Sequence, residues 1–215
     1  MVVSDLDGTL LRSDLTVGGR TRAVLARLEA DGAWVVPATA RQVRGIDLLV
    51  EQISFSGWAI CSNGAVVTHL RTGQVLVEAT LAAAAQRAFA DRVLAAVPGT
   101  VFFGVRDAGT SAAAEPGYQA LALFNDHKRN PAEWDLVSRE ELLGLPNNKI
   151  AIRHPDLGVD ELHQIVRTLD LSDVTVARSG APFLDVTAAG VSKAWGLARL
   201  CEHLGCRRRR GDRVR

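Results

Sequence analysis

Two carboxylates, Asp5 and Asp7, are separated by one residue in the sequence DLDGT at positions 5–9. Side chains two residues apart on an extended backbone lie on the same side. The pair follows a short apolar segment, positions 1–4, which predicts a buried strand that ends at the two acids. Paired carboxylates favour a hard divalent cation such as magnesium. One carboxylate can then act as an anionic nucleophile and the other as an acid or base.

Glycine follows the second acid. Gly8 allows a sharp backbone turn in which amide N–H groups face a phosphate. An Asp-Gly pair is also a common signal for a simple turn, and on this motif alone the two interpretations stay open.

Two further polar residues stand next to predicted strands or helices. Thr39 follows a second apolar segment, positions 34–36, where its hydroxyl either binds a phosphate oxygen or only caps a helix. Lys193 stands at the beginning of a late helix, where a cation is poorly placed for the helix dipole. A bound phosphate and Asp5 would supply the anionic neighbours that this lysine needs. A lysine that simply faces solvent is the alternative.

These residues depend on elements that alternate in the first 79 residues. Short apolar segments predict strands at 1–4, 34–36 and 58–61. Helices are expected at 19–31 and in a segment carrying Val43, Ile46, Leu49 and Val50. Alternation of this kind predicts an α/β fold with a doubly wound parallel sheet and right-handed crossovers.

The pattern changes near residue 80. A helix is expected at 81–96, and apolar segments at 101–103, 120–124, 149–152 and 174–176 predict strands. The stretches 108–117 and 127–131 are rich in small and turn residues and are expected to connect these elements. Because the strands come in groups, we expect a separate α+β unit at 80–185, inserted into a core made of 1–79 and 186–215.

Composition limits the classes of function. The chain has 215 residues, 47% of them hydrophobic and 23% charged, which is typical of a globular protein. A net charge of +1 predicts neither nucleic acid nor membrane as a partner. Three cysteines without a CxxC pair argue against a disulfide framework and a zinc site. The sequence shows no transmembrane run and no signal peptide, so we expect a cytoplasmic protein.

Four segments in order and spacing resemble the haloacid dehalogenase superfamily, and more narrowly its Cof-type sugar-phosphatase branch. They are DLDGT at 5–9, ATAR at 38–41, SNGA at 62–65 and GVSK at 190–193. The resemblance implies a Rossmann-like core with an inserted α+β cap domain that selects the substrate. The likeness is weakest through the middle of the chain, so the sequence does not identify the substrate.

The resemblance also implies a mechanism. Asp5 would attack the phosphorus of a small phosphate monoester, such as a sugar phosphate, and form an aspartyl-phosphate. Asp7 would protonate the leaving alcohol and then deprotonate the hydrolytic water. Magnesium is implied as the cofactor, bound by the Asp5 carboxylate and by Asp7 through its backbone carbonyl. A small phosphorylated metabolite is the expected partner, and the protein is expected to be a monomer or weak homodimer.

The same resemblance assigns phosphate binding to Thr39 and Lys193, together with Gly8 in the turn. Arg41 and Asn63 are candidate substrate contacts by their places in the matching segments. One position departs from the family pattern, because Ala40 stands where the family usually has glycine. We expect this methyl group to have a minor effect.

The last ten residues depart more strongly. The family continues with a buried strand and a Gly-Asp-x-x-Asn-Asp motif, whereas positions 207–210 are four arginines. Arginines do not form a strand that is buried on both faces, so we expect a truncated or frameshifted chain whose tail does not join the sheet. Asp212 follows a glycine, but we expect it not to replace the motif. A catalytically impaired phosphate- or metal-binding protein is therefore the alternative function, and an arginine-led nucleic-acid-binding module is a weaker one.

Overall fold

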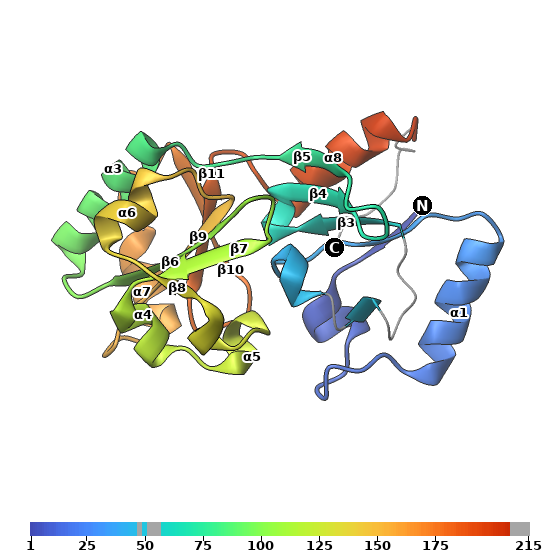
Figure 1. Cartoon of the computed structure of the whole chain (residues 1–215), viewed down its shortest axis with the longest axis horizontal. Helices are drawn as coiled ribbons and strands as arrows, with labels where there is room; N and C mark the ends of the chain where they lie inside the picture. The colour runs from blue at the N-terminus through green and yellow to red at the C-terminus, as the bar shows by residue number, and fades with distance from the viewer. Residues whose placement is uncertain (47–48, 51–56, 207–215) are drawn as a thin grey trace. The chain divides into compact units, whose positions relative to one another are not determined.

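A computed structural model of the chain describes residues 1–46, 49–50 and 57–206 (Figure 1). The chain forms two compact units. Unit 1 consists of Met1–Glu78 and Ser192–Arg215, and unit 2 consists of Ala79–Val191. Their assignment as a catalytic core and an inserted cap stays a prediction. The expected behaviour of the arginine-rich tail and of Asp212 concerns positions 207–215, which lie outside the described residues.

Unit 1 contains the short strands that the apolar segments predict. Its strands are β1 (Val2–Ser4), β2 (Val35–Pro37), β3 (Trp58–Cys61), β4 (Val66–His69) and β5 (Val75–Glu78). Strands β1 and β2 are parallel, and a parallel bridge between Ala38 and Ile60 joins the end of β2 to β3. The predicted parallel arrangement is confirmed. The antiparallel strands β4 and β5, which extend the sheet beyond β3, were not predicted.

The described part of unit 1 includes two long helices, α1 (Gly19–Ala30) and α8 (Lys193–His203). Helix α8 packs Leu200 against a buried cluster that contains Val36, Ile60 and Val67, with Leu197 at its margin. These leucines are three residues apart, so they lie on one face of the helix.

The second predicted helix of this unit lies only partly within the described residues. Val43–Gly45 forms a 3-10 turn, and positions 49–50 are helical. The rest of the segment, at 47–48 and 51–56, is outside the described part of the chain.

Unit 2 is built on a sheet with the strand order β10-β11-β9-β6-β7-β8. Its strands are β6 (Val101–Arg106), β7 (Ser111–Ala114), β8 (Asp135–Leu136), β9 (Lys149–Arg153), β10 (Val174–Arg178) and β11 (Leu184–Ala188). All neighbours are antiparallel except β7 and β8, which are parallel. The predicted domain border at residue 186 falls inside β11.

Helices cover both faces of this sheet (Figure 1). They are α3 (Ala83–Ala96), α4 (Pro116–Leu121), α5 (Phe124–His127), α6 (Arg139–Gly144) and α7 (Val159–Val166). Phe102 belongs to the cluster under α3, α6 and α7, whereas its neighbour Phe103 packs with Tyr118 of α4 on the opposite face. This alternation is the period-two pattern of a strand buried on both sides.

Two sequence predictions in unit 2 are wrong. Positions 120–124, predicted as a strand, instead lie in α4, in the first residue of α5 and in the two residues between them. Helix α4 starts at Pro116, a residue that suits the first turn of a helix because it needs no N–H partner there. Strand β7 falls within 108–117, a stretch that was expected only to connect elements. Its sequence, SAAA, has low intrinsic strand propensity, so pairing with β6 determines its structure.

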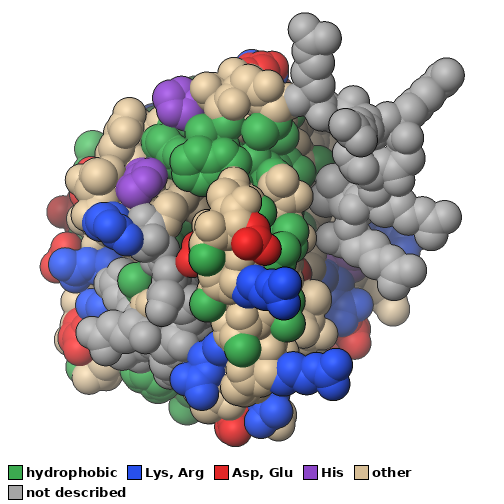
Figure 2. All heavy atoms as spheres, turned by 90° about the vertical axis from the view of Figure 1, so that its right-hand side faces the viewer, with side chains coloured by type: hydrophobic (Ala, Val, Ile, Leu, Met, Phe, Trp, Pro, Cys, Tyr) green, Lys and Arg blue, Asp and Glu red, His purple; other side chains and the backbone are tan. Residues whose placement is uncertain are grey.

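Among the described residues, no helix combines the length and apolar character needed to cross a bilayer. The face drawn in Figure 2 carries basic and acidic side chains next to hydrophobic ones. Such mixing agrees with the net charge of +1.

Candidate active site

The carboxyl ends of three strands of unit 1 are linked side by side. The Ala38 amide donates to the Ser4 carbonyl at 2.8 Å, and the Thr39 amide donates to the Ile60 carbonyl at 2.8 Å. As a result, the residues that follow β1, β2 and β3 begin at the same edge of the sheet. In open α/β sheets this edge is where ligands bind.

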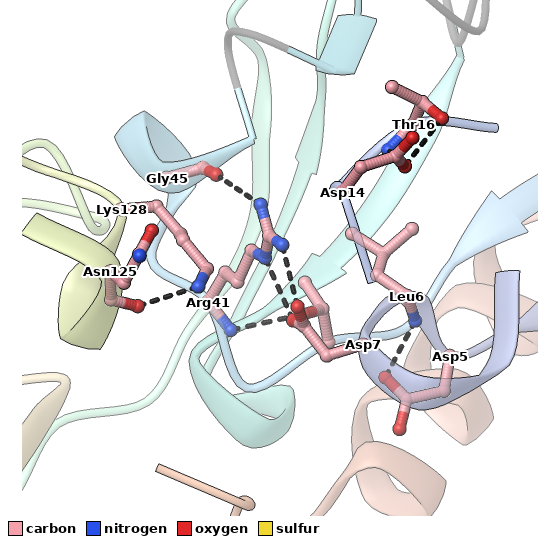
Figure 3. Close-up of polar contacts among 10 residues, drawn as sticks. Asp5, Leu6, Asp7, Asp14, Thr16, Arg41, Gly45, Asn125 and Lys128 are labelled. Atoms are coloured by element: carbon pink, nitrogen blue, oxygen red, sulfur yellow. Dashed lines mark hydrogen bonds and ion pairs between the residues drawn. The ribbon is translucent and has the colours of Figure 1, made fainter. Parts of the chain in front are cut away.

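Asp5 follows β1 directly, and both of its carboxylate oxygens have partners. Oδ1 accepts a hydrogen bond from the Leu6 amide at 2.7 Å (Figure 3). Oδ2 lies 2.7 Å from Nζ of Lys193, the first residue of α8. The two side chains remain about one-third exposed, 34% for Asp5 and 30% for Lys193, so solvent and a small ligand can reach them. The predicted proximity of these residues is therefore present in the structure.

Asp7 faces Arg41 (Figure 3). Nη2 of Arg41 lies 2.6 Å from Oδ1 of Asp7, and Nε lies 2.8 Å from Oδ2. Nη1 of the same guanidinium donates to the Gly45 carbonyl at 3.2 Å. The Arg41 side chain is only 7% exposed, whereas that of Asp7 is 40% exposed. Two parallel bonds of this kind fix the orientation of a carboxylate as well as its position.

The backbone of the first turn bends as its sequence predicts. Gly8 has a φ of 70°, in the left-handed region that glycine adopts without a steric penalty. Thr39 is fully buried, and its hydroxyl oxygen accepts a hydrogen bond from the Arg41 amide at 3.1 Å. This contact is a local turn bond and not a helix cap, because the next helical turn begins at Val43 with Gln42 as its N-cap and no side-chain cap bond. The Thr39 hydroxyl is the acceptor in this contact, so its proton can still be donated to a second partner.

Asn63 lies in the helical turn η3 (Ser62–Gly64) that follows β3. The backbone amide of Asn63 donates to the Thr39 carbonyl at 3.1 Å, and the backbone amide of Ser62 donates to the Arg41 carbonyl at 2.8 Å. The matching segment thus lies beside two other candidate site residues. Gly64 was not singled out from the sequence as a site residue, although the SNGA segment contains it.

A magnesium ion would find oxygen donors from Asp5 and Asp7 in a single turn. Within residues 1–46, 49–50 and 57–206, no group of three or more histidine, cysteine or acidic side chains could hold a metal ion. Two protein ligands still fit magnesium, because this ion usually keeps several waters and binds through one or two carboxylates plus substrate phosphates. The Asp7 carboxylate is held by Arg41, so the carboxylate available to a metal in this turn is that of Asp5.

Comparison with known proteins agrees with this fold and site. The model of the haloacid dehalogenase-like hydrolase family matches residues 2–210. The 5-amino-6-(5-phospho-D-ribitylamino)uracil phosphatase YitU of Bacillus subtilis is 25% identical over 221 residues, which covers 98% of this chain and 77% of that protein. An HMP-PP phosphatase of Cronobacter sakazakii is 26% identical over 208 residues, covering 94% of this chain and 71% of the relative.

Solved structures share the fold. The subclass IIB sugar phosphatase BT4131 superimposes with a TM-score of 0.75 at 20% identity, covering 95% of this chain and 75% of that one. A HAD/COF-like hydrolase from Plasmodium vivax gives a TM-score of 0.76 at 19% identity, covering 96% and 74%.

The chain belongs to the haloacid dehalogenase-like hydrolase family. The family, the fold class and the hydrolase class predicted from the sequence are thereby confirmed. The two relatives described above, which match over nearly the whole chain, are both named phosphatases.

Proposed function

We propose that this chain is a magnesium-dependent phosphatase that hydrolyses a small phosphate monoester through an aspartyl-phosphate on Asp5. One observation carries the proposal. The Asp5 carboxylate stands at the carboxyl edge of the parallel strands, oriented by the Leu6 amide and the Lys193 ammonium. A carboxylate fixed in this way, and still partly exposed, is a preorganised nucleophile.

Reaction would take place in two steps. In the first, an Asp5 oxygen forms a bond to phosphorus, the bond from phosphorus to the ester oxygen breaks, and Asp7 gives its proton to the leaving alcohol. In the second, Asp7 takes a proton from water, the water oxygen bonds to phosphorus, and the Asp5 oxygen leaves. Inorganic phosphate and the original protonation states result. Splitting hydrolysis in this way replaces one difficult displacement with two easier ones.

Lys193 and Thr39 would hold the phosphoryl oxygens, Lys193 by charge and Thr39 through its hydroxyl proton. The turn at Gly8 would present backbone amides to the same group. These donors act where negative charge develops, in a site that exists before the substrate binds. Magnesium, bound by the Asp5 carboxylate and the Asp7 backbone carbonyl, would neutralise phosphate charge.

Arg41 has a different part in this proposal from the one the sequence suggested. The sequence made it a candidate substrate contact, as it did Asn63, and both assignments stay predictions. The buried two-point contact engages both Asp7 oxygens, so it supports a role in holding the Asp7 side chain, which must release one oxygen before it protonates the leaving alcohol. In this role Arg41 is a positioning residue.

The substrate class follows from the relatives and from the domain organisation. The phosphatases of Bacillus subtilis and Cronobacter sakazakii described above are named for phosphorylated metabolites, which supports a sugar phosphate or a similar metabolite as the substrate. We propose that unit 2 is the cap that selects it. The cytoplasmic location and the monomeric or weakly dimeric state expected from the sequence stay predictions.

A second function, the alternative expected from the sequence, stays a prediction. It is a phosphate- or metal-binding protein with impaired turnover. Such a protein would bind phosphate and magnesium without releasing phosphate from an ester.

The test is phosphate release from p-nitrophenyl phosphate and a panel of sugar phosphates in the presence of magnesium, with parent and Asp5→Asn proteins. The amide in Asp5→Asn keeps an oxygen to accept from Leu6, so the variant should fold but lack activity. Asp14→Asn is the matched control, because Asp14 is an exposed aspartate whose carboxylate accepts hydrogen bonds from nearby Thr16. Parent-like turnover by Asp5→Asn would rule out the aspartyl-phosphate. Binding of phosphate by calorimetry without turnover in the parent would select the second function.

A further inference from the structure

The turn after β3 has an unusual backbone. Ser62, Asn63 and Gly64 have φ values of 50°, 55° and 101°, so three consecutive residues are left-handed. Residues with a Cβ atom rarely adopt this conformation, and it persists only where the surrounding structure holds it. The contacts of the turn therefore indicate what this conformation supports.

Two of these contacts lead to the segment after β2. The Ser62 amide donates to the Arg41 carbonyl at 2.8 Å, and the Asn63 amide donates to the Thr39 carbonyl at 3.1 Å. The turn thus holds the backbone on either side of Ala40. The side chains at the two ends of that backbone are the candidate phosphate ligand and the guanidinium that contacts Asp7.

The third contact leads to the start of α8. A Cβ atom added to Gly64 would lie 2.0 Å from the Ser192 carbonyl oxygen and 3.0 Å from the Lys193 amide nitrogen. No side chain fits there, so glycine at this position permits backbone-to-backbone contact. Lys193 directly follows Ser192 in the sequence, and its Nζ contacts the Asp5 carboxylate.

A second glycine completes this contact from the helix side. A Cβ atom on Gly196 would lie 3.0 Å from the Gly64 carbonyl oxygen and 3.0 Å from Cγ2 of Ile60. Gly196 is buried and lies one turn after Ser192, whose carbonyl accepts its amide at 3.0 Å. Glycine inside a helix is unfavourable compared with alanine, so close packing is a physical reason for its presence here.

We propose that the Ser62–Gly64 turn is a positioning element of the active site, and that its contact with Gly196 sets the distance at which Lys193 reaches Asp5. The inference rests on the proposed function, because that function makes Asp5 the nucleophile and Lys193 a phosphate ligand. The turn touches no reacting atom in this proposal. It acts through backbone contacts on two segments, one that carries Thr39 and Arg41 and one that carries Lys193.

Gly196→Ala tests the helix contact. The added methyl group requires Gly64 and Ile60 to give way by a few tenths of an ångström, which displaces the start of α8. Small displacements of reacting groups lower rates steeply, so we expect kcat/KM to fall about tenfold. Gly19→Ala is the matched control, because a Cβ atom on this glycine, the first residue of α1, would meet nothing within 4 Å. It should leave kcat/KM within about twofold of the parent value.

A double-mutant cycle tests whether Gly196 affects kcat/KM through Lys193. If Gly196 acts through Lys193, Gly196→Ala should change kcat/KM less than about twofold in a Lys193→Ala background. Additive losses would show that Gly196 acts independently of Lys193, and the proposal would be overturned.

The acetylation rate of Lys193, which does not depend on catalysis, separates this inference from the proposed function. The sequence has three lysines, Lys128, Lys149 and Lys193, so acetylation of each can be followed by mass spectrometry. In Gly196→Ala, a weaker ion pair with Asp5 should raise the acetylation rate of Lys193 several-fold relative to Lys128. An unchanged rate would contradict the positioning role even in an active enzyme. Lack of phosphatase activity in the parent would contradict only the proposed function.

Asn63→Gly keeps the test decisive if Gly196→Ala does not fold. Glycine adopts a φ of 55° freely, so this variant introduces no clash but loosens the turn. Faster acetylation of Lys193 is again expected. The parent rate in this variant would overturn the proposal.

Discussion

Arg41 holds the carboxylate of Asp7 through two nitrogens, Nη2 at 2.6 Å and Nε at 2.8 Å, across 34 positions of sequence. The guanidinium is almost fully buried, and the carboxylate is not. A buried cation thus fixes an exposed anion. The contact with Arg41 determines the direction in which the Asp7 carboxylate points.

This relationship predicts that Arg41→Lys is not a conservative change. Lysine keeps the positive charge but cannot form the two parallel bonds. We expect kcat for p-nitrophenyl phosphate to fall about 10- to 100-fold, because Asp7 is no longer oriented. The exposed Arg44 gives a control, and Arg44→Lys should retain the parent rate. Equal rates for the two variants would remove Arg41 from the mechanism.

Removal of magnesium provides a second prediction. Treatment with a chelator should abolish phosphate release, and added magnesium should restore it, because Asp5 and the substrate phosphate share the ion. Calcium is larger and tolerates irregular coordination, so it should bind but restore little activity. Phosphate release that persists in excess chelator would show that the residues of this chain act without a metal.

The burial of His127 predicts that the stability of unit 2 depends on pH. Its Nε2 lies 2.8 Å from the Tyr118 hydroxyl, and its ring stacks on Phe183 at 4.4 Å. Burial holds the pKa of His127 well below its usual value of 6.5, and the positive charges of Lys149 and Arg153 add to this effect. The folded protein therefore keeps this imidazole neutral under conditions in which the unfolded chain would protonate it.

The sign of the effect follows from proton binding. Above about pH 6.5 both states are neutral at this position, and the full stability is present. As pH falls below that value, the unfolded chain binds a proton that the folded protein excludes, so stability drops by up to about 1.4 kcal/mol per pH unit. His127→Gln should flatten urea-denaturation midpoints between pH 6.5 and 5 relative to the parent. His163→Gln is the control, and an equal slope in all three proteins would contradict the assignment.

The buried ion pair of unit 2 gives a fourth prediction. Nζ of Lys149 lies 2.8 Å from Oδ1 of Asp185, and the two side chains are 4% and 1% exposed. Lys149→Met removes the cation that contacts the buried Asp185 carboxylate and should lower the free energy of unfolding by about 3–5 kcal/mol.

Replacement of both partners should recover most of this loss. Lys149→Met combined with Asp185→Leu removes both charges of the pair, so no buried carboxylate has to lose its cation. The exposed pair between Arg178 and Asp160 is the control, and Arg178→Met should cost less than about 1 kcal/mol. A double variant as unstable as Lys149→Met alone would mean that packing, not charge, determines the cost.

The sequence was most informative where local pattern and function coincide. The apolar segments before Asp5 and Thr39 predicted strands, and the structure has strands there whose ends are linked. Val66–His69 and Val75–Glu78 carry β-branched residues that could have revealed β4 and β5. SAAA at β7 offered no such signal, because its strand exists through pairing with β6.

Other features depend on distances that a sequence does not contain. ATAR marked Arg41 as part of a site, but nothing local indicated that its guanidinium would contact Asp7. The close approach of Gly64 to Ser192 likewise joins residues 128 positions apart. A glycine in a sequence shows where a backbone is free to bend, whereas the structure shows what it touches.

The neighbours Phe102 and Phe103, each fully buried in a separate cluster, restrict how β6 can change during evolution. Substitution of one phenylalanine alters one core and leaves the other in place. Insertion or deletion of a single residue in β6 would instead exchange the two faces from that point onward. This strand can therefore accumulate replacements one at a time, but its length cannot change by one residue without disturbing both cores together.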